Sequence, residues 1–516
     1  MGEQISLPKT TLNILGASQR VANTDQKILF LGQKTASGSA TSGELNEDVS
    51  TAEIASLFGR DSLIAQELRA FKTINDKSQV DVIALDDNGA GVAATGQFVI
   101  SGTATEAGTI TFDIGSSENN SYEVAVASGD TATDIGDALD VLTAADLDAP
   151  FTTSNSAGTI TVTAKNKGTI ANKIGLRASG TIAGITKSVV AMNGGVTDPT
   201  LTDVFTPIDG VRYQTIVYPA YYAISTIKTL MSARWNVDNK VLDGVAILTN
   251  TDSKADLVSA YTSENNQQIV VIGNKEVSDT AYKGSAIFEL DGVISAQFAA
   301  IRSLRLTPNV SIASLTIAGT NGARDSFGGD AIRSLPYFNT PMTSLPIIPT
   351  GKGFTDSEVS DLNTAGVSVI GNNISRSSII IGEMVTTYKT DAASNTDTSF
   401  KYLNFVDTIS GIREYYFNNL KSRFAQSRLT TGAILPRRSM ANEQVITGYC
   451  IKLYGDLSGE DFVLTQAGET ALTFYKDNLS VTINLAGRSV ALTMQTPIVT
   501  QLANITGSVQ LSFTTA

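Results

Sequence analysis

Hydrophobic and polar positions in the first part of the chain switch between two periods. Residues 28–32 (ILFLG) and 80–85 (VDVIAL) are short apolar runs that predict buried strands. Between them, residues 62–74 repeat apolar side chains every three or four positions, which predicts an amphipathic helix. This alternation of strands and helices is typical of an α/β layer structure.

The pattern then changes to one of alternation. Apolar and polar positions alternate with period two in three runs, residues 109–115, 121–127 and 159–165. That period predicts half-buried antiparallel strands, and helical spacing at 130–146 lies among them. Because turn sequences at 86–89 and 193–195 mark both ends, residues 91–198 are predicted to form a β-rich domain inserted in a surface loop. An immunoglobulin-like or adhesin module would have a similar composition.

The α/β alternation resumes after the predicted insert. Further strands are predicted at residues 215–219, 244–249 and 268–273, and further helices at 223–235, 255–261 and 285–306. A capped helix start is predicted at 355–358 (TDSE), a helix end at Gly366, and a strand directly after it. The predicted strand ends carry no glycine-rich phosphate loop, so an α/β enzyme is supported by fold analogy alone.

Residues 381–429 combine a predicted strand with a long predicted helix. The strand is expected at 384–390 (MVTTYKT), and a polar link with Asp397, Ser399 and Phe400 follows it. Apolar positions then recur at spacings of three or four at Leu403, Val406, Ile409, Ile412, Tyr416, Leu420 and Phe424. The cations of this helix are mostly off the stripe; they are Arg413, Lys421, Arg423 and Arg428. Their face is either simply solvated or used to contact a partner.

Composition and charge exclude several classes of function. The chain has 516 residues and a net charge of −13, which disfavours nucleic acid as a partner because phosphate contacts need a basic surface. It has no histidine, which excludes Ser-His and Cys-His catalytic pairs and the commonest zinc ligand. Its one cysteine, Cys450, excludes a disulfide within the chain. Cys450 lies among apolar residues and is predicted to be a buried free thiol.

Searches for motifs with a known chemistry add nothing to this picture. The sequence contains no convincing phosphate loop or nucleophile elbow, and no apolar run long enough to span a membrane. Its start does not resemble a signal peptide. We therefore expect no catalytic residues, no metal, no cofactor and no membrane insertion.

The segment at 381–429 resembles the signature of the contractile tail sheath proteins of Mu-type bacteriophages. The matching positions are Met384, Val385, Thr386, Thr387, Tyr388 and Thr390 in the strand, Asp397, Ser399 and Phe400 in the link, and Arg413, Tyr415, Tyr416, Phe417, Arg423 and Phe424 in the helix. Residues 353–370, and residues 128–134 and 160–169 of the predicted insert, resemble the same family. The resemblance covers the chain almost throughout and is most specific at 353–429.

The resemblance implies a fold class and an order of domains. The expected fold is a mixed α+β and α/β multidomain chain: an α/β core sandwich with an inserted β-rich outer domain and extended terminal β-arms. The expected domains are an N-terminal arm at 1–18, the first part of the core at 19–90, the inserted outer domain at 91–198, the second part of the core at 199–380, a C-terminal inner sheath domain at 381–507 and a C-terminal β-arm at 508–516.

Both ends of the chain have the pattern of strands. Apolar positions interleaved with polar ones are Ile5, Leu7, Leu12 and Ile14 near the start, and Val509, Leu511 and Phe513 near the end. A lone terminal strand is not stable, so each must pair with this chain's own sheet or with a neighbour's. In sheath proteins such arms exchange strands between subunits, and the resemblance implies that these seven residues lie at a subunit interface. It also implies that Arg413, Lys421, Arg423 and Arg428 face an inner tube.

The function implied by the resemblance is that of a tail sheath subunit. Such a subunit polymerises helically around the inner tail tube and contracts to drive the tube through the host envelope. Its partners would be copies of itself, the inner tail tube protein, and baseplate and tail terminator proteins. It would be part of the virion tail, assembled in the cytoplasm of a bacterial host. The sheath of an R-type bacteriocin or a related contractile injection system is an alternative; an α/β enzyme or a surface adhesin is less favoured.

Overall fold

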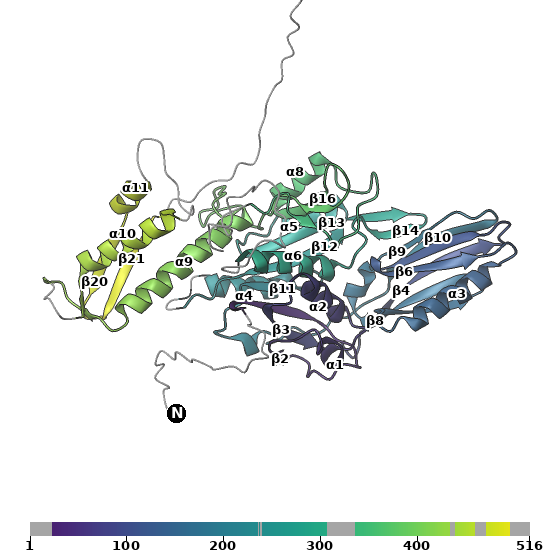
Figure 1. Ribbon diagram of the computed structural model, residues 1–516, viewed down its shortest axis with the longest axis horizontal. Helices are drawn as coiled ribbons and strands as arrows, with labels where there is room; N and C mark the ends of the chain where they lie inside the picture. Colours follow the sequence, from purple (N-terminus) through teal and green to yellow (C-terminus); the bar gives the residue numbers. More distant parts are fainter. Residues whose placement is uncertain are drawn as a thin grey trace, which may run out of the picture.

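The computed structural model describes residues 23–235, 237, 240–306, 336–433, 439–459 and 471–495. The molecule is elongated, with an α/β body in the middle, a β-rich outer part at one end and a C-terminal part at the other (Figure 1). Seven interface residues predicted from the sequence lie outside the described residues: Ile5, Leu7, Leu12, Ile14, Val509, Leu511 and Phe513. Their pairing therefore stays a prediction.

The body is built on a mostly parallel sheet with helices on both faces. Its strands, in the order of the sheet, are β2 (Leu45–Asn46), β3 (Ser78–Leu85), β1 (Asn23–Gln33), β11 (Thr215–Val217), β12 (Val245–Asp252), β13 (Ile269–Asp279) and β16 (Val367–Asn372). All neighbours pair in parallel except β2 with β3. The helices are α1 (Ile54–Phe58), α2 (Leu63–Ile74), α4 (Ile224–Trp235), α5 (Lys254–Tyr261), α6 (Asp291–Leu306) and α8 (Asp356–Ala365), and η2 (Thr206–Ile208) is a short 3₁₀ turn.

Alternation along β1 separates the two cores of the body. Ile28 and Phe30 pack into a cluster with α1, α2 and α6, whereas Leu29 and Leu31 pack into a second cluster with α4, α5 and α8. Burying each of these side chains contributes about 1.5–3 kcal/mol, so the two clusters fix which helices cover each face. The predicted strands and helices of the body are confirmed, apart from the start of the helix predicted at 285–306, and so is the mixed α/β class of the fold.

The helix predicted at 285–306 is wrong at its start, because the helix in the structure begins six residues later. The structure starts α6 at Asp291 and places Ser285 at the end of β14 (Tyr282–Ser285), paired with Glu276. The side-chain amide of Asn274 donates to the carbonyl oxygen of Ile287 and accepts from its N–H, each over 3.1 Å. These bonds hold the chain extended where helical spacing alone would continue the helix.

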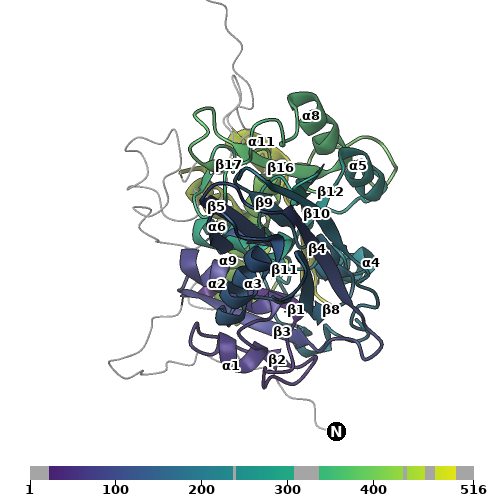
Figure 2. The same cartoon turned by 90° about the vertical axis from the view of Figure 1, so that its right-hand side faces the viewer.

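The outer part has a hydrophobic cluster that also includes Leu63, Leu290 and Val293 of the body. Its elements are β4 (Ala93–Gly102), β5 (Gly108–Ile114), β6 (Ser116–Val126), α3 (Ala132–Ala145), β7 (Phe151–Ser156), β8 (Thr159–Lys167), η1 (Thr169–Lys173), β9 (Leu176–Ser179) and β10 (Ile185–Asn193). One sheet has the order β10-β4-β8-β7; β9, β5 and β6 form a second layer, and Figure 2 views both layers from this end. Val92 and Val196 form an antiparallel bridge where the chain enters and leaves the outer part. Strand β14 pairs with β9, so this second layer continues the sheet of the body.

The C-terminal part is carried on one long helix. The remaining elements of the chain are β15 (Pro341–Met342), β17 (Ile379–Ile381), α9 (Leu403–Phe424), β18 (Arg428–Leu429), β19 (Met440–Ala441), α10 (Glu443–Gly459), α11 (Ala471–Asp477), β20 (Ser480–Asn484) and β21 (Ser489–Thr493). Strands β15 and β17 remain in the body beside β16, whereas the others lie beyond α9 (Figure 1). The capped start of α8, with reciprocal bonds between Thr355 and Glu358, and its end at Gly366 are confirmed.

Two predictions for the segment at 381–429 are wrong. Residues 384–390 form only isolated bridges, at Val385 and Thr390, rather than a strand. Their backbone groups have scattered partners instead of one ladder: the N–H of Val385 donates to Ser368 Oγ over 2.8 Å, and that of Thr387 donates to the carbonyl oxygen of Ile269 over 2.9 Å. Arg428 is not on the helix but in β18, because α9 ends at Phe424 and the N–H of Arg428 donates to the carbonyl oxygen of Ser439.

Candidate functional site

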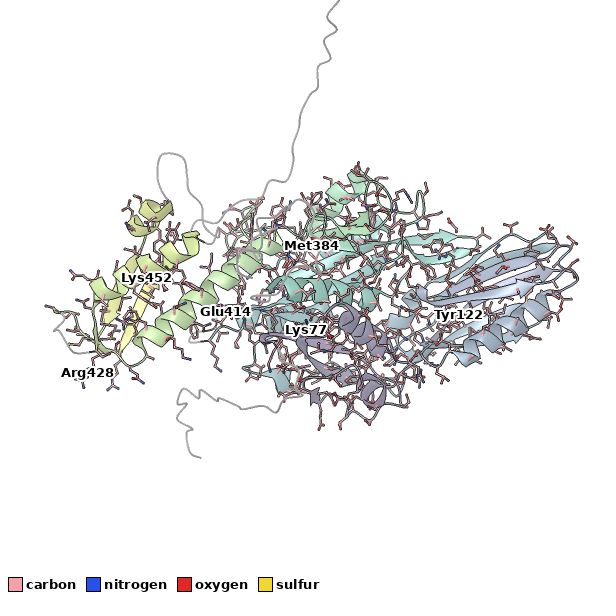
Figure 3. All side chains as sticks on the ribbon, viewed as in Figure 1. Lys77, Tyr122, Met384, Glu414, Arg428 and Lys452 are labelled. Atoms are coloured by element: carbon pink, nitrogen blue, oxygen red, sulfur yellow. The ribbon has the colours of Figure 1, made fainter. Side chains whose placement is uncertain are left out.

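Helix α9 connects two separate hydrophobic cores and is the centre of the candidate site. Leu403 and Val406 in its first turn belong to the core of the body, whereas Ile412 and Tyr416 belong to a cluster of the C-terminal part. Its 22 residues span about 33 Å at the usual rise per residue. Figure 3 shows Glu414 part-way along this helix and Arg428 at the far end of the C-terminal part. The helix is therefore a strut between the two parts.

The body end of the strut is held by a buried ion pair. Arg302 on α6 lies 2.6 Å from Asp407 on α9, and the two side chains are 4% and 0% exposed. The hydroxyl of Tyr337 donates to the other oxygen of Asp407 over 2.6 Å. Burial alone would lower the pKa of Arg302, but the Asp407 carboxylate raises it above its ordinary value. Burial and the same carboxylate raise the pKa of Tyr337.

A second polar cluster, around Asp243, lies one turn further along α9. The carboxylate of Asp243 accepts from the hydroxyl of Ser410 and lies 3.4 Å from Arg413 and 3.8 Å from Arg212. Arg212 also pairs with Glu414 over 2.9 Å. Since Asp243 is 2% exposed, its pairing with two arginines offsets the cost of burying its charge.

Arg413 therefore has a role within the chain. Besides Asp243, its guanidinium donates to the carbonyl oxygens of Trp235, Val237 (3.1 Å) and Lys240 (3.3 Å). These bonds use most of its donors against the body. The prediction that this residue faces a tube is not tested by the structure, but its contacts provide a different reason for an arginine there.

The other predicted tube-facing cations are exposed. Lys421 and Arg423 are near the end of α9, each beside an aromatic ring of the same helix, at 5.6 Å from the ring of Phe417 and 5.9 Å from that of Phe424. Arg428 is exposed in β18. Within the part of the chain that the structure describes, no carboxylate forms an ion pair with these three residues. The contact of these three cations with an acidic inner tube stays a prediction.

Lys389, in the segment before α9, ties two helix ends together. Its ammonium donates over 2.9 Å to the carbonyl oxygen of Tyr261, the last residue of α5, and over 2.9 Å to that of Ala365, the last residue of α8. Cations are favoured at helix C-termini, where carbonyl groups lack partners. Beside it, the hydroxyl of Thr387 donates to the carbonyl oxygen of Asn266. The signature segment therefore joins β13, α5 and α8.

A small layer of helices and a hairpin covers the far end of the strut. Tyr416 of α9 and Tyr475 of α11 share a hydrogen bond of 3.0 Å, and Tyr475 stacks on Tyr454 of α10 with ring centroids 4.2 Å apart. Cys450 is a free thiol buried in this layer, as predicted, and burial raises its pKa to about 11. Strands β20 and β21 form an isolated two-stranded sheet.

Metal-type clusters and membrane-spanning helices are both absent from the described residues. Among them, no group of three or more His, Cys, Asp or Glu side chains is arranged to hold a metal ion. No helix within these ranges is both long and apolar enough to cross a bilayer.

The sequence did not reveal the residues that hold the strut. Asp407 is next in sequence to Val406, which belongs to the apolar stripe. A carboxylate beside a buried position indicates that a hydrogen-bonding or cationic partner exists. Its partner Arg302 is 105 residues away in sequence, however, and no periodicity links them. Asp243 and Lys389 were missed for the same reason.

Comparison with known proteins gives a relative over most of the length. The chain is 26% identical over 440 residues to the Mu-like prophage FluMu tail sheath protein of Haemophilus influenzae, covering 84% of this chain and 82% of the relative. No protein-family model matches the chain. The predicted similarity to Mu-type tail sheath proteins is confirmed by this relationship.

Solved structures are similar at a lower level of identity, and two of them are sheath tail proteins. A sheath tail protein from Desulfitobacterium hafniense has 12% identity and a TM-score of 0.42, with 95% of this chain and 100% of that chain covered. One from Listeria innocua has 12% identity and a TM-score of 0.44, with 92% of each chain covered. A chain in the contracted baseplate of the anti-feeding prophage has 12% identity and a TM-score of 0.44, covering 98% and 99%.

Proposed function

From its sequence relationship to a Mu-like prophage tail sheath protein, we propose that this chain is the sheath subunit of a contractile tail. Copies of it polymerise helically around an inner tail tube, and contraction drives the tube through the host envelope. The observation that carries the proposal is the 26% identity over 84% of the chain. A structural role of this kind needs no catalytic residues, metal or cofactor.

The proposed assembly depends on strand exchange between subunits. Residues 4–17 and 508–516, outside the described residues, are the proposed donors, and the hairpin of β20 and β21 is the proposed acceptor. Among described residues each strand of this hairpin pairs only with the other, so both outer edges have unpaired backbone groups. One face is half-buried against α9 and α10 through Val481, Ile483, Val490 and Leu492. A two-stranded sheet gains stability from added strands.

Strand exchange of this type explains why the product is a tube. A donor at one place on the subunit and an acceptor at another form a heterologous contact, which repeats without closing. Each subunit can then rotate as a rigid body during contraction while the exchanged strands keep neighbours joined. The rigid strut α9 would transmit that rotation between the body and the C-terminal part.

The proposed inner surface includes Lys421, Arg423 and Arg428. These side chains are exposed at the end of the molecule that also carries the proposed acceptor hairpin. We assign residues 381–507 to an inner sheath domain and residues 91–198 to an outer domain that projects away from the tube. Baseplate and tail terminator proteins are the further partners proposed, and the virion tail is the proposed location.

Electron microscopy of the purified chain tests the proposal. The full-length protein is expected to form long tubes in negative stain, because self-assembly needs only the subunit. Deletion of residues 509–516 is expected to abolish tubes and leave a folded protomer with unchanged circular dichroism. Tubes formed by the truncated protein would contradict strand exchange, and a permanently monodisperse full-length protein would contradict the sheath role.

A further inference from the structure

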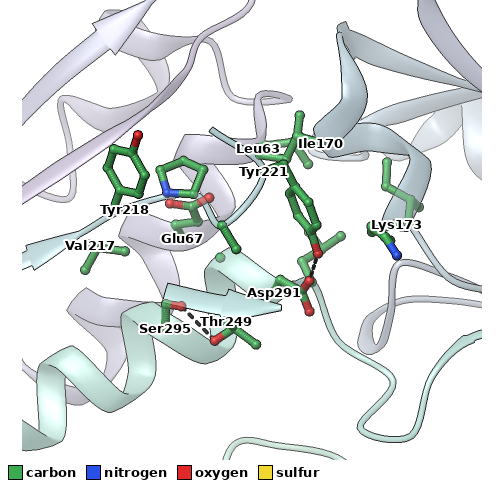
Figure 4. Close-up of a pocket in the computed structure, with 15 residues that line it drawn as sticks. Leu63, Glu67, Ile170, Lys173, Val217, Tyr218, Tyr221, Thr249, Asp291 and Ser295 are labelled. Atoms are coloured by element: carbon green, nitrogen blue, oxygen red, sulfur yellow. Dashed lines mark hydrogen bonds between the residues drawn. The ribbon is translucent and has the colours of Figure 1, made fainter. Parts of the chain in front are cut away.

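Carboxyl groups gather where the outer part meets the body. Glu67 on α2 and Asp291 at the start of α6 line one cavity of about 30 Å³, which has room for about one or two water molecules (Figure 4). Ile170 and Lys173 of η1, from the outer part, form its opposite wall. Glu289, two residues before Asp291, accepts a hydrogen bond over 2.7 Å from the hydroxyl of Ser116 at the start of β6.

We propose that Glu67, Glu289 and Asp291 form a pH-sensitive latch, which seats the outer part on the body when protonated and loosens that seat when ionised. The proposal is independent of the sheath role. It concerns a junction inside one chain, with no contact between copies.

The burial of Glu67 is the first argument for the latch. Its side chain is 4% exposed, and its Oε2 atom has no hydrogen-bond partner. Its Oε1 atom lies against Gly292, where a Cβ would be only 2.0 Å away. Only glycine therefore leaves room for this carboxyl group, which lacks a cation to stabilise its charged form. Burial raises the pKa of Glu67 to about 8.

The other two carboxyl groups also favour the neutral form. Glu289 is 4% exposed, and burial raises its pKa to about 7 although it accepts bonds from Ser116 and from the N–H of Leu290. Burial likewise raises the pKa of Asp291 to about 7, although it accepts two bonds from Thr251. Moderately alkaline pH would therefore place up to three negative charges in one junction.

The groups that face the cluster supply one positive charge, Lys173, which lowers the pKa of Asp291 but is outweighed by burial. Those packed around it are Lys173 on η1, Asp252 on β12, Tyr221 and Tyr222 after β11, and Glu118 on β6. Lys173 is the one lysine or arginine among the described residues that line the cavity, and it pairs with Asp252 over 3.3 Å. Tyr221 donates to Asp291 and adds no positive charge. Hydration of the ionised carboxylates therefore requires water to enter between η1 and the pair α2 and α6.

Hydrogen–deuterium exchange of the full-length chain at pH 6.0 and pH 8.5 tests the latch, with rates corrected for the chemical effect of pH. Peptides covering 169–175 and 288–293 are expected to exchange about tenfold faster at pH 8.5 in the native sequence, while β12 is unchanged. Glu67→Gln keeps a neutral side chain of the same shape, and it is expected to reduce the rise to threefold or less. Glu289→Gln is a second variant with the same expectation.

The control is Glu123→Gln, on an exposed position of β6, which is expected to match the native sequence. The latch is overturned if both Glu67→Gln and Glu289→Gln retain the full tenfold rise. An equal rise in β12 would also overturn it, because the pH effect would then be global unfolding rather than a loosened junction.

Discussion

The guanidinium of Arg302 on α6 lies 2.6 Å from the carboxylate of Asp407 on α9, with both side chains almost fully buried. Each charge is removed from water, so the pair stabilises the junction only while both partners are present. The pair fixes the rotation of α9 about its own axis because the carboxylate must point at α6. That rotation decides which face of the strut is left for Lys421 and Arg423.

Asp407→Leu is expected to lower the free energy of unfolding by about 3–5 kcal/mol, because it leaves the Arg302 charge buried without its partner. Urea unfolding followed by circular dichroism measures the change. The double variant Arg302→Met with Asp407→Leu is expected to recover most of the loss. As a control, Asp456→Ala breaks the exposed pair with Lys452 and is expected to cost less than about 1 kcal/mol. Equal losses at the two sites would contradict the anchoring role of Asp407.

Lys389→Met is expected to destabilise the body by about 1–2 kcal/mol, because the last carbonyl groups of α5 and α8 lose their shared donor. Methionine keeps most of the side-chain length, so the loss reports the ammonium rather than the packing. Thermal unfolding measures it, with Lys452→Met on exposed α10 as the matched control. An unchanged melting temperature for Lys389→Met would show that the two helix ends are satisfied without it.

The comparison of sequence and structure shows where local patterns are sufficient. The strand at 80–85 and the helix at 62–74 were predicted because each element buries a face whose period appears in its own residues. The segment at 384–390 has the residue types of a strand, yet its backbone bonds go to scattered partners in other elements, such as the Ser368 side chain and the Ile269 carbonyl oxygen. The partner of a buried charge is equally invisible, since Arg302 and Asp407 come together only in three dimensions.

The stability of the chain is expected to fall as pH rises from about 4.5 to about 9. Burial raises the pKa of Glu67 to about 8 and those of Glu289 and Asp291 to about 7, so the folded chain holds protons that the unfolded chain has already lost. An excess of bound protons in the folded state makes stability decrease with pH across that window. Because the folded-state pKa of Glu67 is about 8, the loss is expected to level off only about one pH unit above that value.

Glu67→Gln isolates one contribution to that slope. The variant is expected to be about 2–4 kcal/mol more stable than the native sequence at pH 8.5. It is expected to be nearly equal to it at pH 4.5, where the native carboxyl group is neutral in the folded state and about half protonated in the unfolded state. Unfolding in urea at the two pH values measures this difference. A stabilisation of the same size at both pH values would mean that packing, and not ionisation, is responsible.

Reversal of charge at Lys421 and Arg423 tests the proposed inner surface. The variant Lys421→Glu with Arg423→Glu is expected to fold normally, because both side chains are exposed, each beside an aromatic ring of its own helix. If these cations contact an acidic inner tube, the variant should still polymerise into empty sheaths by itself. It should bind the purified inner tube protein at least tenfold more weakly than the native sequence at low salt. Cosedimentation of tubes measures the binding, and raising the salt concentration should narrow the difference, since screening weakens exposed charge pairs. The control is Lys452→Glu, an exposed cation on α10. Equal binding by the native and reversed proteins would place the tube against another face of the C-terminal part.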